Sequence, residues 1–408
     1  MIKIHLLILF LLLGTGIHPA KAQYIPGKLS GDATFSILTV GPAEPAYTMF
    51  GHTGLRLQDP RHQIDLVYNY GTFNFDAPGF FWKFLYGDLD YFLSVQDFEQ
   101  FKQSNIDLGR SIVSQTLDIS QAQINDLFKT LEQNSLPENR SYRYRFFSQN
   151  CVIQVVDVLS DERIWSPPGQ IQAMAISGST YRQKLGAYLS NRPWMRLGIN
   201  LMLGVSADQP LTDREQNFLP NALHLSLANA TNAVGERIVQ SNETIATAAI
   251  QKQDRPLPPF VVFWIGLLIV IVLTLISLLM RWQTWWLDRI LFGSVGFLGL
   301  IIAFGAFVSL HEPLHYNWNL LWALPTHLLV AIGVQTFSRN KWLRLYFWVT
   351  LVGNTATLAA WTMISQQLPP PAIPILGSLM VRSAFRLYVN VPQPVSVRRK
   401  ATISNHLS

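Results

Sequence analysis

The chain of 408 residues contains one cysteine, Cys151. An internal disulfide needs two cysteines, so a scaffold held together by disulfides is excluded. A lone thiol in an exported protein is therefore either a small buried hydrophobe or a reactive group. Charged residues are also scarce, at 14% of the chain. Basic residues never form a block with interleaved aromatics, so we expect no nucleic-acid partner.

The N-terminus has the pattern of an export signal. Lys3 precedes the apolar residues 6–13, and a small-residue A-x-A pattern at residues 20–22 stands directly before Gln23. This pattern predicts a signal peptide over residues 1–22. Because cleavage would leave Gln23 rather than a cysteine at the N-terminus, the mature protein should not itself be a lipoprotein. If uncleaved, the segment would act as an anchor, although about a dozen apolar residues are short for a span.

Hydropathy divides the rest of the chain into two unlike parts. Residues 23–255 carry scattered charges and are long enough to bury a sizeable core, which predicts a soluble α+β domain. Residues 256–391 predict an all-α transmembrane domain of four to five helices, and residues 392–408 a cytoplasmic tail. The predicted spans are long apolar runs at residues 260–280 and at about 290–310, 318–337 and 346–365.

A fifth apolar run, at about residues 371–391, is weaker because it contains Arg382 and Arg386. It is either a span whose arginines snorkel to the interface or an interfacial helix. Basic residues gather in the tail and in the loops at 281–289 and 339–344, whereas the opposite loops at 312–317 and 366–371 have no lysine or arginine. The positive-inside rule then predicts a multi-pass protein of the inner membrane with its N-terminal domain in the periplasm.

The sequence around Cys151 indicates a helix that begins at the thiol. Cys151 follows Asn150 and opens an apolar stretch at residues 152–159. At a helix N-terminus, unpaired amides and the helix dipole stabilise a thiolate. A histidine nearby would stabilise the thiolate further and would act as base or acid.

His52 is the best histidine partner for the thiol. It lies in an alternating, strand-like run at residues 50–57, with glycines on both sides. A second strand-like run, at residues 64–70, follows a turn signal at 59–60. The other histidines of this domain have no motif: His62 lies in a turn and His224 on an amphipathic segment.

A hairpin centred near residues 60–61 would place His52 directly across from Asn69, which could hold the imidazole through a hydrogen bond. The predicted catalytic site is therefore Cys151, His52 and Asn69. A shift of the hairpin centre would replace Asn69 by Asp65, Tyr68 or Tyr70. A histidine strand that precedes the cysteine helix is similar to the circularly permuted papain-like folds of NlpC-type and lecithin:retinol acyltransferase-like enzymes.

Several motifs together resemble the Lnb family, which joins a periplasmic thiol domain to membrane spans. They are residues 50–56 (FGHTGLR), 68–73 (YNYGTF), 87–91 (GDLDY), Asn150-Cys151, Asp208 with 218–220 (FLP), and 311–325. The resemblance implies a lipoprotein N-acyltransferase with Cys151 and His52 as the catalytic pair. A phospholipid would donate a fatty acyl chain through a cysteine thioester, and the N-terminal amine of a diacylglyceryl-cysteine lipoprotein would accept it, without metal or cofactor.

Other residues are weaker candidates for binding. The amide at the helix start and the side chain of Asn150 or Gln149 could bind the oxyanion. Arg56 could bind a phosphate head group or be a solvated strand residue. In the outward loop, His311, His315, Asn317 and Asn319 could contact head groups or frame the path of the acyl chain; with no third ligand, they predict no metal site.

Alternative functions stay open at this stage. A cell-envelope cysteine peptidase or amidase would use the same triad, but a soluble substrate gives no reason for several spans. A phospholipase or thioesterase differs only in passing the acyl group to water. A non-catalytic membrane assembly protein would make Cys151 dispensable. The aromatic residues 80–86 would lie either against the bilayer or in the core.

Overall fold

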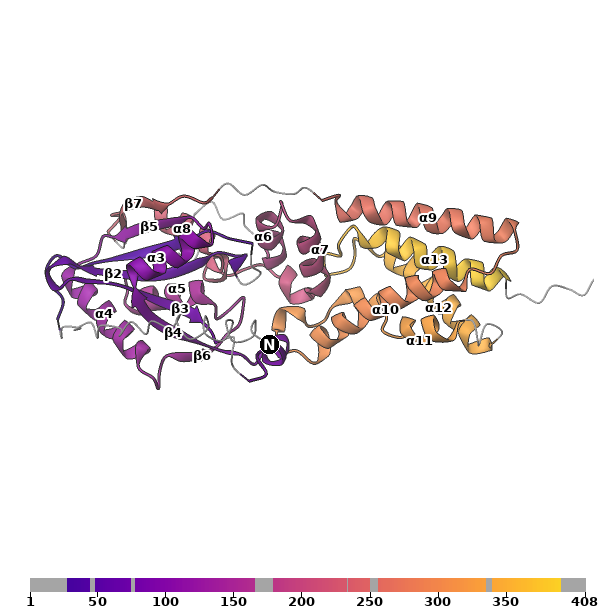
Figure 1. Ribbon diagram of the computed structural model, residues 1–408, viewed down its shortest axis with the longest axis horizontal. Helices are drawn as coiled ribbons and strands as arrows, with labels where there is room; N and C mark the ends of the chain where they lie inside the picture. The colour runs from indigo at the N-terminus through magenta and orange to yellow at the C-terminus, as the bar shows by residue number, and fades with distance from the viewer. Residues whose placement is uncertain are drawn as a thin grey trace, which may run out of the picture.

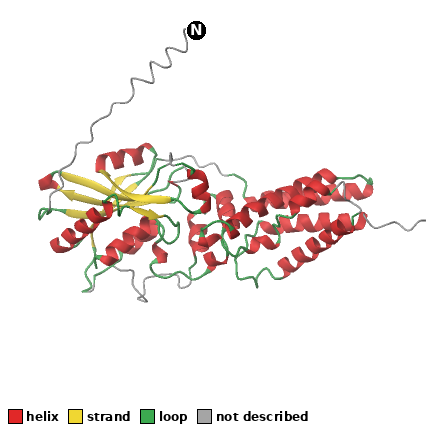
Figure 2. Ribbon diagram, turned by 90° about the horizontal axis from the view of Figure 1, so that it is seen from below, coloured by secondary structure: helices red, strands yellow, loops and turns green. Residues whose placement is uncertain are grey.

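A computed structural model describes residues 28–44, 48–74, 78–165, 179–232, 234–249, 256–334 and 340–389. The predicted signal peptide (1–22), the end of the first domain (250–255) and the predicted tail (392–408) lie outside the described residues. The molecule is elongated (Figure 1), and all strands lie at one end while the other end consists of helices (Figure 2). We call these ends the sheet domain and the helical region.

The sheet domain is built on a seven-stranded antiparallel sheet with the order β6-β4-β3-β2-β1-β5-β7. Residues 35–38 of β1 are all buried, and β2 alternates between buried and half-buried residues only in its second half, because both faces of these central strands are covered. The strands are β1 (Thr34–Val40), β2 (His52–Asp59), β3 (Ile64–Thr72), β4 (Asp90–Asp97), β5 (Ile112–Leu117), β6 (Ser141–Arg143) and β7 (Val239–Ala246).

The β2–β3 hairpin carries the predicted histidine and asparagine. Its turn is a 3₁₀ helix, Pro60–His62, capped by the Asp59 side chain. Leu55 pairs with Tyr68, so the hairpin centre lies one residue later than predicted. The expected placement of His52 directly across from Asn69 is therefore wrong by two residues. Because a shift by two preserves the face, both side chains still point to the same side of the sheet.

Helices cover both faces of the sheet. On one face, α4 (Gln121–Ser135) and α5 (Cys151–Asp161) form the main core with the β2 and β3 side chains. On the other face, α3 (Phe98–Asp107) packs Phe98 and Phe101 against a smaller cluster of β1, β3 and β5 residues. These layers confirm the predicted α+β class.

Two helices, α6 (Tyr181–Tyr188) and α7 (Pro193–Met202), form the joint between the two ends. A third, α8 (Pro220–Ala228), packs on the sheet, and its Leu223 and Leu227 belong to the main core. The α7 side chains Leu197 and Leu201 belong to the core of the helical region. Arg182 of α6 forms a buried ion pair with Asp208 at 2.7 Å. The Asp208 carboxylate also accepts a bond of 3.2 Å from the Gln367 amide in the helical region, so it ties both ends together.

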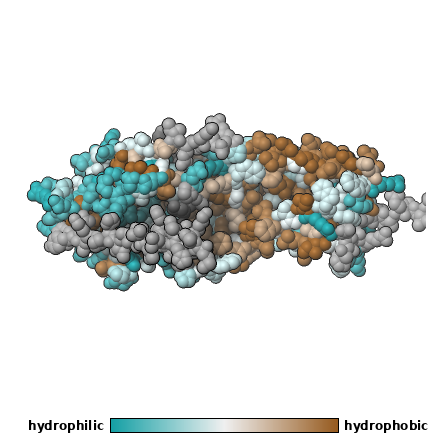
Figure 3. Space-filling model, in the orientation of Figure 1, coloured by the Kyte–Doolittle hydropathy of each residue, from teal (hydrophilic) through white to brown (hydrophobic). Residues whose placement is uncertain are grey.

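The helical region contains α9 (Pro259–Leu279), α10 (Trp285–Phe307), α11 (His327–Gly333), α12 (Lys341–Ala359) and α13 (Ala372–Val389). Among the described residues, α9, α10 and α13 are long and apolar enough to cross a membrane. Figure 3 shows the apolar surface gathered over this region and polar surface over the sheet domain. The third predicted span is not one helix: residues 318–321 form a 3₁₀ helix, and α11 has seven residues. The fourth begins and ends earlier than predicted, as α12.

Arg382 and Arg386 correct the expectation of snorkelling arginines. Both side chains are fully buried, and both bind the equally buried Asp288 of α10, at 2.6 Å and 2.5 Å. Arg382 also donates to the Thr274 hydroxyl of α9 at 3.0 Å. The Asp288 carboxylate offsets the cost of burying the two cations. Helix α13 can therefore carry two arginines on the face that packs against α9 and α10 and remain apolar elsewhere.

Candidate thiol site

The thiol and the imidazole meet at a glycine. Cys151 is the first residue of α5, His52 is the first residue of β2, and Gly71 lies in the irregular end of β3. Gly71 has a φ of 88°, and a Cβ there would lie 3.2 Å from Cys151 Cβ and 3.9 Å from His52 Cε1. The missing side chain therefore leaves the space in which the two reactive groups approach each other.

The His52 ring is oriented by Asn69. His52 Nε2 forms a short hydrogen bond with Asn69 Oδ1. An amide oxygen only accepts, so Nε2 carries the proton and Nδ1 keeps its lone pair. Burial, followed by the charge of Arg110, lowers the pKa of His52 to about 4, and the bond to Asn69 opposes this shift. The imidazole is therefore neutral at pH 7, with a basic nitrogen that has no hydrogen-bond partner among the described residues.

Cys151 is half-buried and surrounded by backbone amides. Burial raises the pKa of its thiol, and hydrogen bonds from the amides of Thr53, Val152 and Cys151 itself oppose this shift. The amides at the helix start favour the thiolate, as expected, but desolvation outweighs them, so the resting protein favours the thiol. The site holds a neutral thiol beside a neutral imidazole.

Arg110 is a buried cation that the sequence analysis missed. Its guanidinium donates to the Gly41 carbonyl at 2.7 Å and to Asn105 Oδ1 at 2.8 Å. Its charge lowers the pKa of both His52 and Cys151. It therefore keeps the imidazole neutral and favours negative charge on the sulfur. No local pattern marks this residue, because Gly41, His52 and Cys151 are all distant from it in the sequence.

Three tyrosines lie close enough to Cys151 for its charge to affect them. A charge on Cys151 raises the pKa of Tyr91, of Tyr142 and of Tyr144, although burial is the larger cause for each; for Tyr91 the pKa rises to about 12. The Tyr91 and Tyr144 rings stack with their centroids 3.9 Å apart.

The other predicted oxyanion donors behave differently from expectation. Asn150 is the N-cap of α5: its Oδ1 accepts from the Ile153 amide at 2.9 Å. Its Nδ2 donates to the carbonyls of Phe146 and Phe218, at 2.8 Å and 2.7 Å. Both amide protons are used, so Asn150 positions the helix and is not an oxyanion donor. The Gln149 side chain is exposed.

Arg56 and the alternatives to Asn69 are engaged elsewhere. The Arg56 guanidinium pairs with Asp65 at 2.7 Å and lies 3.3 Å from the centre of the Phe98 ring. Tyr68 donates to Glu132 at 2.6 Å, and the Tyr70 hydroxyl accepts from Asn134 at 2.9 Å. The geometry therefore selects Asn69 as the partner of His52.

The four candidates in the outward loop mainly hold the joint. The Asn317 side chain is buried and donates to the carbonyls of Leu201 and Met202, at 2.8 Å and 2.9 Å. Asn319 is fully buried and donates to the same Leu201 carbonyl at 3.1 Å. His315 donates to the Ser309 carbonyl at 2.8 Å, and His311 to the Phe84 carbonyl at 3.0 Å. Burial of the two asparagines contradicts the prediction that they contact head groups.

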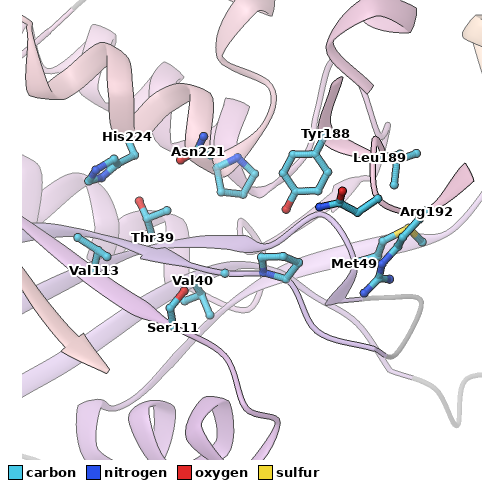
Figure 4. Close-up of a pocket in the computed structure, with 14 residues that line it drawn as sticks. Thr39, Val40, Met49, Ser111, Val113, Tyr188, Leu189, Arg192, Asn221 and His224 are labelled. Carbon is cyan, nitrogen blue, oxygen red and sulfur yellow. The ribbon is translucent and has the colours of Figure 1, made fainter. Parts of the chain in front are cut away.

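A cavity of about 380 Å³ lies beside this site, between the ends of β1 and β5 and the helices α6 and α8 (Figure 4). Val40, one of its lining residues, is the β1 partner of His52. Cys151, His52 and Asn69 are not among the lining residues. Among the described residues, no group of three or more His, Cys, Asp or Glu side chains could hold a metal ion.

The arrangement supplies four chemical elements: a thiol nucleophile, a neutral base, a group that orients the base, and amides converging on the sulfur. Such a set suits attack on a carbonyl carbon, in which a proton leaves the thiol and negative charge develops on oxygen.

Comparison with known families gives two matches. Residues 22–175 match the Lnb N-terminal periplasmic domain, and residues 251–393 match the Lnb transmembrane domain. No curated protein and no solved structure is significantly similar to the chain. The two matches confirm the resemblance seen in the sequence.

Proposed function

Because the chain belongs to the Lnb family of membrane proteins with a periplasmic domain, we propose that it is a thiol-dependent lipoprotein N-acyltransferase. It moves a fatty acyl chain from a membrane phospholipid to the N-terminal amine of a diacylglyceryl-cysteine lipoprotein. One observation carries the proposal: Cys151 opens helix α5 beside His52, whose ring is held by Asn69. The inverted order of histidine and cysteine supports a circularly permuted papain-like fold.

In the first half-reaction, Cys151 Sγ attacks the carbonyl carbon of the lipid ester while His52 Nδ1 takes the thiol proton. The amides of Cys151 and Thr53 stabilise the tetrahedral oxyanion. The C–O bond then breaks, and the leaving lysophospholipid oxygen takes the proton from His52. The acyl group remains on Cys151 as a thioester.

In the second half-reaction, the amine of the lipoprotein attacks the thioester carbon. His52 accepts a proton from the attacking nitrogen, the C–S bond breaks, and the proton passes to the departing Cys151 sulfur. An amide forms and the thiol is restored. The neutral resting pair suits this cycle, because Nδ1 is ready to accept a proton at pH 7.

The membrane region supports bilayer substrates. The loops at residues 308–326 and 360–371 contact the periplasmic domain, whereas residues 280–284 join the opposite ends of α9 and α10. This alternation favours a multi-pass protein of the inner membrane with the thiol on its outer side. Donor and acceptor are both lipid-anchored, so fusion of a thiol domain to spans places the nucleophile close to both.

The test is the N-terminal acylation of a reporter lipoprotein, read by mass spectrometry in a host depleted of its own N-acylation. We expect a triacylated reporter with the wild type and a diacylated reporter with Cys151→Ala. His62→Gln, a histidine change in the same hairpin, is the matched control and should leave the reporter triacylated. Triacylation by Cys151→Ala would overturn the thiol mechanism, and a diacylated reporter with a correctly inserted wild type would favour a hydrolase.

A further inference from the structure

Helix α2 (Phe80–Tyr86, FFWKFLY) exposes aromatic side chains to solvent. Phe81 is 63% exposed and Trp82 is 68% exposed, and Phe84 and Tyr86 are also exposed. A soluble domain rarely leaves so large an apolar patch uncovered. The expectation that these residues pack in the core is therefore wrong, and the question is what covers them.

Helix α2 is hydrogen-bonded to the residues that follow α10, and this position indicates what covers the exposed rings. The Leu310 amide donates to the Tyr86 carbonyl at 2.6 Å, and the Ser309 hydroxyl to the Leu85 carbonyl at 3.0 Å. Gly87, with a φ of 86°, packs so closely that a Cβ there would lie 3.2 Å from the His311 amide nitrogen. These contacts hold α2 at the level where a candidate membrane span ends.

Exposed apolar residues at the same level continue the surface. Phe307 is 80% exposed and Tyr316 is 82% exposed, and Leu310 and Trp318 are exposed as well. Tryptophan and tyrosine prefer the boundary between hydrocarbon and water, where the ring is apolar and its polar tip is wet. The α2 surface is therefore continuous with the surface that the bilayer covers.

A row of aromatic rings leads from α2 to the thiol. Phe84 stacks on Phe80 with centroids 6.4 Å apart, and Phe80 on Phe73 at 5.7 Å. Phe73 contacts Tyr91 at 5.1 Å, and Tyr91 stacks on Tyr144. Phe73 is two residues after Gly71, where a Cβ would lie 3.2 Å from Cys151 Cβ. This row of rings leads from the exposed patch toward Cys151.

We propose that α2 inserts into the outer leaflet and that the lipid ester reaches Cys151 along this row of rings. The partner of the surface is a lipid bilayer. The insertion stands on the exposed rings and their link to α10, whereas the lipid path rests on the proposed acyl transfer. The site of access is therefore set by α2 rather than by the buried asparagines of the outward loop.

Membrane insertion can be measured without activity. Cys151 is the only cysteine, so Cys151→Ala gives a background in which Trp82→Cys carries a single environment-sensitive fluorophore. In phospholipid nanodiscs we expect its emission to be quenched by lipids with a spin label near the head group. A fluorophore at Leu136→Cys, on an exposed residue of the periplasmic domain, is the matched control and should not be quenched. Equal, weak quenching at both positions would overturn the insertion.

The lipid path is tested by comparing two acyl donors. Phe81→Ser with Trp82→Ser should slow thioester formation from bilayer phospholipid about tenfold more than formation from a soluble short-chain ester, because less apolar area anchors the helix. The control Leu136→Ser with Leu225→Ser should change both rates equally. An equal loss with both donors in the α2 variant would overturn the path. If the wild type forms no thioester from either donor, the proposed function fails, and quenching at position 82 would then leave α2 as a membrane anchor alone.

Discussion

Each half of the molecule holds an imidazole with little exposure, His327 fully buried and His52 half-buried, and the two make different hydrogen bonds. In the membrane region, His327 donates from Nε2 to the Trp322 carbonyl at 3.0 Å and accepts at Nδ1 from the Tyr346 hydroxyl at 2.9 Å. In the periplasmic domain, His52 uses Nε2 for Asn69, and the Cε1 edge of its ring lies near Gly71, which also packs against Cys151. Burial alone therefore does not distinguish a structural histidine from one that can act as a base. The features that point to a base are a ring nitrogen without a hydrogen-bond partner among the described residues and a thiol nearby.

Substitution of these two histidines should affect the rate of acyl transfer very differently. His52→Gln removes the base that we propose for the thiol proton, so we expect acyl transfer to fall about a thousandfold. His327→Gln removes a ring whose nitrogens are both engaged, so the rate per folded protein should stay within about threefold of wild type. Rates are measured with purified full-length protein in nanodiscs. A similar loss in both variants would mean that His52 acts through stability and is not a base.

The two regions also differ in how they hold their ion pairs. In the membrane region, Asp288 is the shared anion of two fully buried arginines, whereas Arg56 and Asp65 of the sheet form a half-exposed pair. Asp288→Asn leaves two buried cations without an anion, so we expect the free energy of unfolding to fall by about 3 kcal/mol. The control Asp65→Asn should cost less than about 1 kcal/mol, because water screens an exposed pair.

This difference is measured by SDS titration of the full chain in mixed micelles, with helical circular dichroism as the signal for the membrane region. Equal costs for the two substitutions would mean that the Asp288 cluster is hydrated and that α13 does not depend on it. If Asp288→Asn lowers the free energy of unfolding more than Asp65→Asn does, then the pairing of Asp288 with the two buried arginines stabilises this helix bundle.

Short-range patterns in the sequence predicted much of the site. Alternating hydrophobicity located β2 and β3, and the apolar run after Cys151 located α5, because each signal is local. The face shared by His52 and Asn69 was predicted correctly although the register was not, since an error of two residues does not change the face. The family resemblance added the link between the thiol domain and the membrane spans.

Long-range contacts could not be read in this way. Arg110, whose charge affects His52 and Cys151, is distant from both in the sequence. The two carbonyl groups that bind the Asn150 side chain cannot be identified from the sequence around it. Arg382 and Arg386 lowered the hydropathy of the last span, but their anion lies on another helix. A thiolate was expected from the helix N-terminus, and the opposing desolvation depends on packing that no local pattern records.

The last prediction concerns the protonation states of Cys151 and His52. Burial raises the pKa of Cys151 and lowers that of His52 to about 4, so the resting pair is neutral between these two values. Alkylation by iodoacetamide needs the thiolate, so its rate should rise about tenfold for each pH unit from pH 5 to pH 8, without a plateau. Arg110→Met removes a charge that favours the thiolate and should shift this rise to higher pH. A thiolate–imidazolium pair would instead give a high, flat rate from low pH that collapses in His52→Gln, and that profile would contradict the neutral resting site.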